Sequence, residues 1–194
     1  MPFEIVRNDI VNMQVDAVVN TANPNPVIGS GVDSGIHKKA GHELLVARQE
    51  IGCIDFGDAA ITSGFDLDAR YVIHTVGPVW KDGSHREEQI LSSCYRNSLT
   101  LAKEHECESI AFPLIATGNY GFPKPLALQI AVREISTFLL EMKCRFIWLC
   151  LAKKHSPFRK NCSNPLAVTL TKTISAAKRL MNMERKACMV LVLK

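Results

Sequence analysis

The chain has 194 residues, of which 47% are hydrophobic, and it shows neither a signal peptide nor a membrane span. This composition excludes a membrane protein and fits one globular domain, which we expect to be soluble and cytoplasmic. The seven cysteines include no Cys-x-x-Cys pair, which argues against a disulfide framework and a structural zinc site. The net charge of +4 conceals an asymmetry: residues 1–141 carry −7 and residues 142–194 carry +11.

Strands and helices are predicted to alternate along the first 141 residues. Short apolar runs predict strands over 3–6, 17–20, 59–62, 71–76 and 109–115. Helices are predicted between them, over 33–50, 86–106 and 124–141. In the last helix one face is apolar and should be buried: Leu128, Ala131, Val132, Ile135, Phe138 and Leu139. Such alternation predicts a layered α/β domain with a largely parallel sheet.

Two glycine-containing loops, 20–35 and 116–124, follow predicted strands, where α/β proteins bind ligands. The first contains the pattern G-x-G-x-x-x-G at Gly29, Gly31 and Gly35, which superficially resembles a dinucleotide-binding loop. A Rossmann loop turns directly from strand into helix, whereas eight residues separate Asn20 from Gly29 here. We therefore favour a loop whose backbone amides approach an anion, and two such loops indicate a ligand with two phosphates.

Asp33 and His37 stand at the start of the helix that follows the first loop. Their spacing of four residues places both side chains on one helix face, near the glycines. Two interpretations remain open at this stage. The pair could be catalytic, or Asp33 could be an ordinary N-cap followed by an ordinary helical histidine.

Five segments, in this order and spacing, resemble the macro domain family, and most closely its MacroD-type ADP-ribosyl hydrolases. They are NDI (8–10), DAVVNTAN (16–23), GSGVDSGIHKKAG (29–41), YVIHTVGPVW (71–80) and AFPLIATGNYGFP (111–123). The resemblance implies a three-layer α/β/α fold with a mixed, largely parallel central sheet. It covers about residues 3–141.

The resemblance also implies a role for individual residues in binding ADP-ribose. Asp9, beside Ile10, would accept the adenine amino group, and Asn23 would hold the distal ribose, while Asn20 would be structural. The diphosphate and distal ribose would lie between Gly29, Ser30, Gly31 and Val32 on one side and Thr117, Gly118, Asn119 and Tyr120 on the other. Two alternatives stay open, since Asp9 could be a simple turn residue and Tyr120 could serve packing alone.

Asn23, Asp33 and His37 would form the catalytic set. A carboxylate can polarise water and stabilise positive charge on a ribose, so we expect hydrolysis of ADP-ribosylated acidic side chains, of O-acetyl-ADP-ribose, or of both. A non-catalytic ADP-ribose reader is the alternative. The zinc-dependent subgroup's Cys/His set is missing from the sequence, so we expect neither a metal nor another cofactor.

The sequence departs from the family pattern in three places. Ile28 and Ser30 replace glycines of the family loop, and Ala116 replaces a frequent serine. After residue 141 the sequence diverges from the family pattern, although the apolar run 145–152 could form a strand and residues 164–181 could form a helix. We hypothesise a frameshift near codon 141. The rivals are a genuinely divergent ending and a basic extension that binds nucleic acid. The first 141 residues, at −7, offer no general basic surface for nucleic acid.

Overall fold

The computed structural model describes residues 3–141 and 146–151. Within these residues, six strands form one sheet: β1 (Phe3–Arg7), β2 (Ala17–Thr21), β3 (Ala59–Ser63), β4 (Tyr71–Thr75), β5 (Ser109–Pro113) and β6 (Phe146–Leu151). The helices are η1 (Ile10–Asn12), α1 (Val32–Ala40), α2 (His42–Ile51), α3 (Glu87–Glu104) and α4 (Lys124–Glu141). None of these helices is long and apolar enough to cross a membrane.

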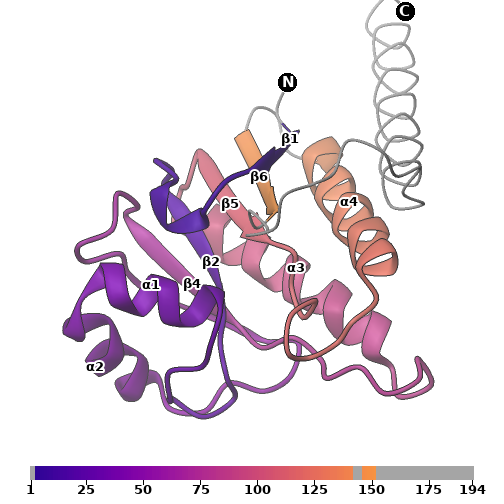
Figure 1. Cartoon of the computed structure of the whole chain (residues 1–194). Coiled ribbons are helices and arrows are strands. Elements are labelled where there is room, and N and C mark those ends of the chain that lie inside the picture. Colours follow the sequence, from indigo (N-terminus) through magenta and orange to yellow (C-terminus); the bar gives the residue numbers. More distant parts are fainter. Residues whose placement is uncertain (1–2, 142–145, 152–194) are drawn as a thin grey trace, which may run out of the picture. The chain divides into compact units, whose positions relative to one another are not determined.

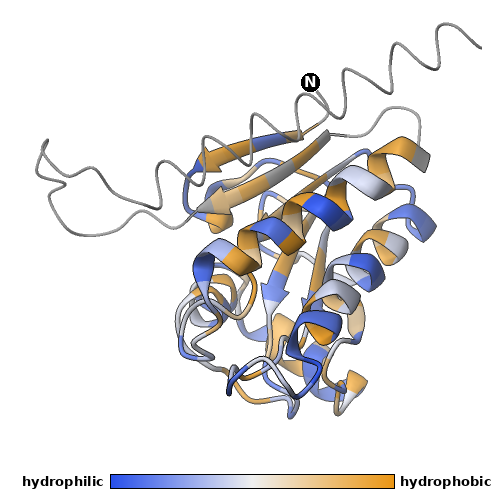
Figure 2. Cartoon of the chain, turned by 90° about the vertical axis from the view of Figure 1, so that its right-hand side faces the viewer, coloured by the Kyte–Doolittle hydropathy of each residue, from blue (hydrophilic) through white to orange (hydrophobic). Residues whose placement is uncertain are grey.

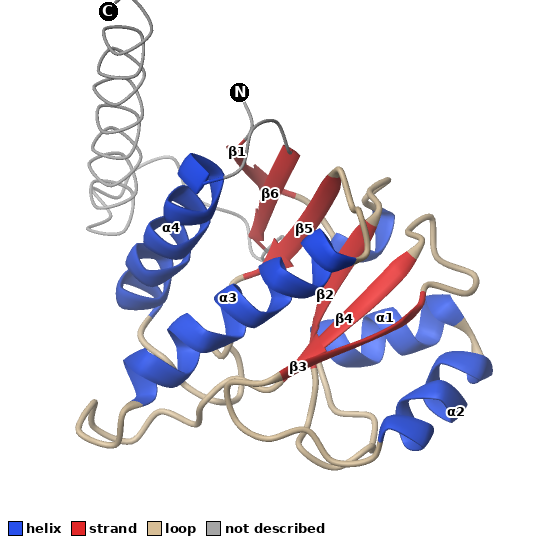
Figure 3. Cartoon of the chain, turned by 180° about the vertical axis from the view of Figure 1, so that it is seen from behind, coloured by secondary structure: helices blue, strands red, loops and turns tan. Residues whose placement is uncertain are grey.

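The helices cover both faces of the sheet. Opposite views show α1 and α2 on one face and α3 and α4 on the other (Figures 1 and 3). This arrangement confirms the predicted three-layer α/β/α fold. The strand order is β1-β6-β5-β2-β4-β3, with β3 antiparallel to β4 and every other neighbouring pair parallel, as expected for a mixed, largely parallel sheet.

Strands β2 and β5 separate at their carboxyl ends. Their pairing covers only Ala17 opposite Ile110 and Val18 opposite Ala111, although β2 continues to Thr21 and β5 to Pro113. Because the strands are parallel, the two glycine loops leave the sheet from the same edge. The topology thus brings the two predicted ligand loops together.

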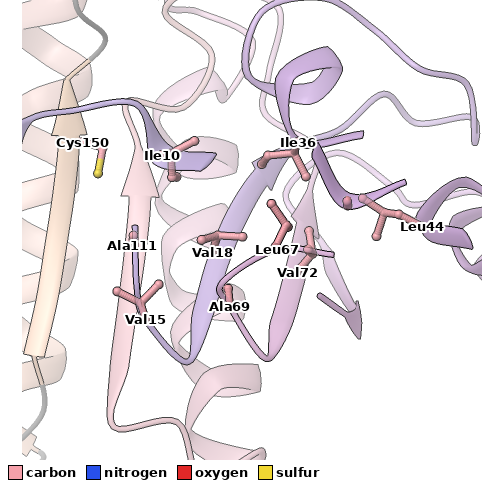
Figure 4. Close-up of a cluster of buried hydrophobic side chains, with 11 residues drawn as sticks. Ile10, Val15, Val18, Ile36, Leu44, Leu67, Ala69, Val72, Ala111 and Cys150 are labelled. Atoms are coloured by element: carbon pink, nitrogen blue, oxygen red, sulfur yellow. The ribbon is translucent and has the colours of Figure 1, made fainter. Parts of the chain in front are cut away.

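The core follows the apolar pattern of the sequence. Figure 2 shows largely hydrophobic strands, whereas the helices carry both kinds of residue. Under α1 and α2, Ile36 and Leu44 point toward Val18 of β2 and Val72 of β4 (Figure 4). The predicted stripe of α4 is confirmed: four of its residues are buried (Leu128, Ala131, Val132, Ile135) and two are half-buried (Phe138, Leu139).

The predicted single helix over 33–50 is wrong. The structure has two helices, α1 and α2, which are separated by Gly41. Gly41 has a φ of +87°, a backbone conformation that favours glycine and cannot continue a right-handed helix. The break lets α1 and α2 take different directions over the same face of the sheet.

The segment beyond residue 141 supplies an internal strand of the sheet. The apolar run expected there forms β6, which pairs with β1 on one side and β5 on the other. Its side chains Ile147, Leu149 and Cys150 are buried. The predicted helix over 164–181 lies outside the described residues, and both the domain boundary at 141 and the frameshift hypothesis stay predictions.

Replacing Leu149 with alanine tests whether β6 is part of the core. Leu149 is completely buried, so we expect Leu149→Ala to lower the free energy of unfolding by about 2–5 kcal/mol. Leu140→Ala on the exposed side of α4 is the matched control and should change it by less than about 0.5 kcal/mol. Urea unfolding followed by circular dichroism measures both, and equal small effects would show that β6 adds nothing to the core.

Candidate functional site

Asp33 lies in the first turn of α1, after the loop that follows β2. It is 2% exposed, and each carboxylate oxygen accepts a hydrogen bond: Oδ1 from Asn20 Nδ2 at 2.6 Å and Oδ2 from the Gly29 backbone N–H at 2.5 Å. The residue at the N-cap of α1 is Gly31, so the interpretation of Asp33 as an N-cap is wrong. The carboxylate instead ties the glycine loop to β2.

The glycines of the two loops serve different purposes. A Cβ added to Gly29 would lie 3.0 Å from Asn23 Nδ2 and 3.3 Å from Asp33 Oδ2, closer than ordinary van der Waals contact, so a larger residue would push these side chains outward. Gly31 and Gly118, in contrast, have no neighbouring atom within 4 Å of an added Cβ and border open space. The Gly29 amide therefore serves the protein's own carboxylate, and its contact with a diphosphate stays a prediction.

His37 lies beside Asp33, as the spacing predicts. The distance from His37 Nε2 to Asp33 Oδ1 is 3.6 Å, and both side chains are buried. Burial lowers the pKa of His37, the charge of Arg48 lowers it further, and Asp33 partly offsets these effects. The imidazole is therefore mainly neutral at pH 7.

The two glycine loops are joined by side-chain hydrogen bonds. Tyr120 donates its hydroxyl to Asn23 Oδ1 at 3.4 Å, and Asn119 Nδ2 donates to Ser30 Oγ at 2.7 Å. Asn23 also donates to the carbonyl of Val27 in its own loop. Asn23 and Tyr120, both predicted to meet the distal ribose, thus lie next to each other.

The remaining predicted binding residues frame the same edge of the sheet. Val32 packs against the core at the start of α1, and Thr117 Oγ1 donates to the carbonyl of Leu114. Both side chains therefore shape the two loops from within. The contacts of these residues with a diphosphate stay a prediction.

Asp9 and Ile10 lie between β1 and β2. Asp9 is exposed and accepts a hydrogen bond from the Val11 backbone, which caps η1, while Ile10 is buried in the core. Ile10 and Cys150 belong to the same buried cluster, which places Asp9 near the carboxyl end of β6. Burial, and secondarily the charge of Asp9, raises the pKa of the Cys150 thiol to about 11. Asp9 therefore does act as a turn residue, and its adenine contact stays a prediction.

Among the described residues, one group could offer ligands to a metal: Asp82, His85 and Glu87, in the segment that enters α3. Both carboxylates already accept hydrogen bonds. Asp82 accepts from the backbone and hydroxyl of Ser84, which lowers its pKa to about 2, and Glu87 accepts from the backbone N–H of His85. These bonds give both carboxylates a role in shaping the turn, and the expected metal independence stays a prediction.

Comparison with known proteins agrees with the geometry, because the model of the macro domain family matches residues 19–131. The chain belongs to the macro domain family. An O-acetyl-ADP-ribose deacetylase of Escherichia fergusonii is 49% identical over 141 residues, which are 71% of this chain and 80% of that protein. Other relatives of similar identity carry only general macro domain names.

Solved structures of macro domains share the fold. The Oceanobacillus iheyensis macrodomain with ADP has a TM-score of 0.75 and 41% identity, covering 78% of this chain and 84% of that one. The Trypanosoma brucei macrodomain in complex with ADP-ribose has a TM-score of 0.73 and 36% identity, covering 77% of this chain and 63% of that one.

Sequence reasoning missed three buried polar residues around the site of this macro domain. Arg48 of α2 donates to the carbonyls of Asn23, Pro24 and Gly52, and thereby holds the start of the glycine loop. His74 of β4 and Thr62 of β3 extend the hydrogen bonds of Asn20 into the sheet. The sequence did contain a sign of their burial: Arg48 follows the buried Leu44 by one helical turn, and His74 interrupts an apolar strand.

The buried histidines make the stability of the macro domain depend on pH. Burial is the main cause that lowers the pKa of His74, to about 3, with the charges of Arg48 and His37 adding to it. Between that value and the unfolded value near 6.5 only the unfolded chain gains this proton, so stability falls as the pH falls through this window.

We expect the free energy of unfolding to drop by about 2 kcal/mol or more between pH 7 and pH 5, where carboxylates remain mostly ionised. Replacing His74 with asparagine removes one titrating group and should shrink this drop, whatever the variant's stability at pH 7. Urea unfolding at the two pH values measures it. An identical drop in both proteins would contradict a buried, neutral His74.

Proposed function

We propose that this macro domain binds ADP-ribose and, without a metal, removes mono-ADP-ribose from acidic side chains, deacetylates O-acetyl-ADP-ribose, or does both. The observation that carries the proposal is the buried carboxylate of Asp33, fixed by Asn20 and Gly29 at the point where the two glycine loops meet. A module that only reads ADP-ribose has no chemical need for such a group.

The arrangement of the loops supports ADP-ribose as the ligand. The diphosphate would lie along residues 29–32 and 117–120, with the adenine toward Asp9 and the distal ribose toward Asn23 and Tyr120. The hydrogen bond between Asn23 and Tyr120 already brings these two groups together. The named relative and the two solved structures, with ADP and ADP-ribose, support the same ligand class.

Hydrolysis needs water delivered to an electron-poor carbon while an oxygen of the substrate leaves. One water adds its hydroxyl to the carbon under attack and its proton to the departing oxygen, so the products are a free acid and a free ribose hydroxyl. Asp33 would polarise the water or stabilise positive charge on the ribose, and Asn23 would orient the ribose. His37, mainly neutral beside Asp33, would stabilise the placement of that carboxylate.

Replacing Asp33 with alanine separates catalysis from binding. We expect Asp33→Ala to lower the turnover of Glu-linked mono-ADP-ribosylated protein about 100-fold or more, the range for loss of a group acting in proton transfer. Titration calorimetry should still detect ADP-ribose binding, but with a weaker affinity, because the backbone amides of both loops remain while the bonds of Asp33 to Asn20 and Gly29 are lost. Asp55→Ala, at an exposed position beyond α2, is the matched control and should behave as the wild type.

The result also decides between the enzyme and the reader. If wild type and Asp33→Ala both bind ADP-ribose and neither releases it from protein, the reader stands and the hydrolase is excluded. If the wild type and Asp33→Ala turn the substrate over at the same rate, Asp33 has no part in the chemistry.

A further inference from the structure

A row of polar side chains crosses the sheet beside the site. Asn20 of β2 and His74 of β4 are fully buried, and Thr62 of β3 is 9% exposed. Asn20 lies opposite His74 in the parallel pair β2–β4, while the strands around them are otherwise mostly Val, Ile and Ala. Polar groups in such surroundings destabilise a fold unless they are hydrogen-bonded, which constrains their arrangement. In this row the Asn20 nitrogen, both ring nitrogens of His74 and the Thr62 hydroxyl have partners, whereas Asn20 Oδ1 has none among the described residues.

The hydrogen bonds of this row have one consistent direction. The carboxylate of Asp33 can only accept, so the Asn20 group at 2.6 Å must be its N–H. The same amide nitrogen lies 3.2 Å from His74 Nδ1, which must then accept, and His74 Nε2 must carry the proton. Nε2 donates to Thr62 Oγ1 at 3.0 Å, and the Thr62 hydroxyl is directed to the carbonyl of Val72 at 3.5 Å.

We propose that Thr62 and His74 are positioning residues, which fix the Asn20 amide so that its N–H group faces Asp33. This positioning role rests on the hydrolase function proposed above, because the Asn20 amide affects catalysis only by orienting the Asp33 carboxylate. Neither residue belongs to the glycine loops, and three hydrogen bonds separate Thr62 from Asp33.

The alternative arrangement is strongly unfavourable. A proton on His74 Nδ1 would face the Asn20 N–H, and the amide would have to turn over to avoid the clash. Its oxygen would then face the Asp33 carboxylate at a distance where two acceptors repel each other. A charged imidazole would cause the same conflict, and the burial of His74, which lowers its pKa to about 3, keeps the ring neutral.

Replacing Thr62 with valine tests the proposal with little change of shape. The variant loses the acceptor for Nε2–H, so His74 can adopt the Nδ1–H form. We expect kcat on O-acetyl-ADP-ribose or Glu-linked ADP-ribosylated protein to fall about tenfold, the scale of one misplaced buried hydrogen bond. KM and the calorimetric Kd for ADP-ribose should stay within about twofold, since the loops are untouched.

Two variants act as controls. Thr62→Ser keeps the hydroxyl and should restore kcat to near the wild-type value. Thr75→Val removes another buried hydroxyl, on β4, which donates to the carbonyl of Asp58 and has no hydrogen bond to the row. It should leave kcat unchanged. An equal loss in Thr62→Val and Thr75→Val would show a general effect on stability and overturn the proposal, as would a wild-type kcat in Thr62→Val.

NMR of the imidazole nitrogens gives a second test that needs no activity. The wild type should show neutral His74 protonated at Nε2, and Thr62→Val should shift both this signal and the Asn20 side-chain amide signal. If the wild type fails to turn over any ADP-ribosyl substrate, the hydrolase proposal fails while these signals still decide the positioning role. A wild-type His74 protonated at Nδ1, or an Asn20 amide unaffected in Thr62→Val, overturns it.

Discussion

The site depends on how the Asp33 carboxylate is held, by one short hydrogen bond to each of its two oxygens. One comes from Asn20 at the end of β2 and the other from the Gly29 backbone, so the carboxylate joins the strand, the glycine loop and the start of α1. A buried carboxylate without such partners would be strongly destabilising. The close backbone approach at Gly29 and the buried amide of Asn20 both follow from this requirement.

The two glycine loops lie in an acidic part of the chain, so the positive charge that an anion needs does not come mainly from nearby Lys or Arg side chains. Residues 1–141 carry −7, and the loop segments 22–31 and 114–123 contain neither Lys nor Arg. Attraction for a diphosphate must therefore come from backbone N–H groups and from the positive end of α1. Arg48 adds a buried positive charge behind the loop, where it donates to the carbonyls of Asn23 and Pro24. Recognition of this kind depends on loop geometry more than on net charge.

The sequence was sufficient to predict the layers, the six described strands and the meeting of the two loops, because apolar runs and glycine positions are local signals. It did not show the break at Gly41, since helical residues on both sides of one glycine read as a continuous helix. It also left Asp33 ambiguous, because a cap and a buried carboxylate have the same local pattern. The row of Asn20, His74 and Thr62 depends on strand pairing between distant segments, which no local pattern reveals.

We infer that ADP-ribose binds at the carboxyl ends of β2 and β5 with its distal ribose at Asp33. A crystal structure of the protein with ADP-ribose tests it most directly. We predict the diphosphate between residues 29–32 and 117–120, the adenine beside Asp9 and the distal ribose between Asn23 and Tyr120, facing Asp33. A ligand bound elsewhere, or bound with its adenine end at Asp33, would contradict the account.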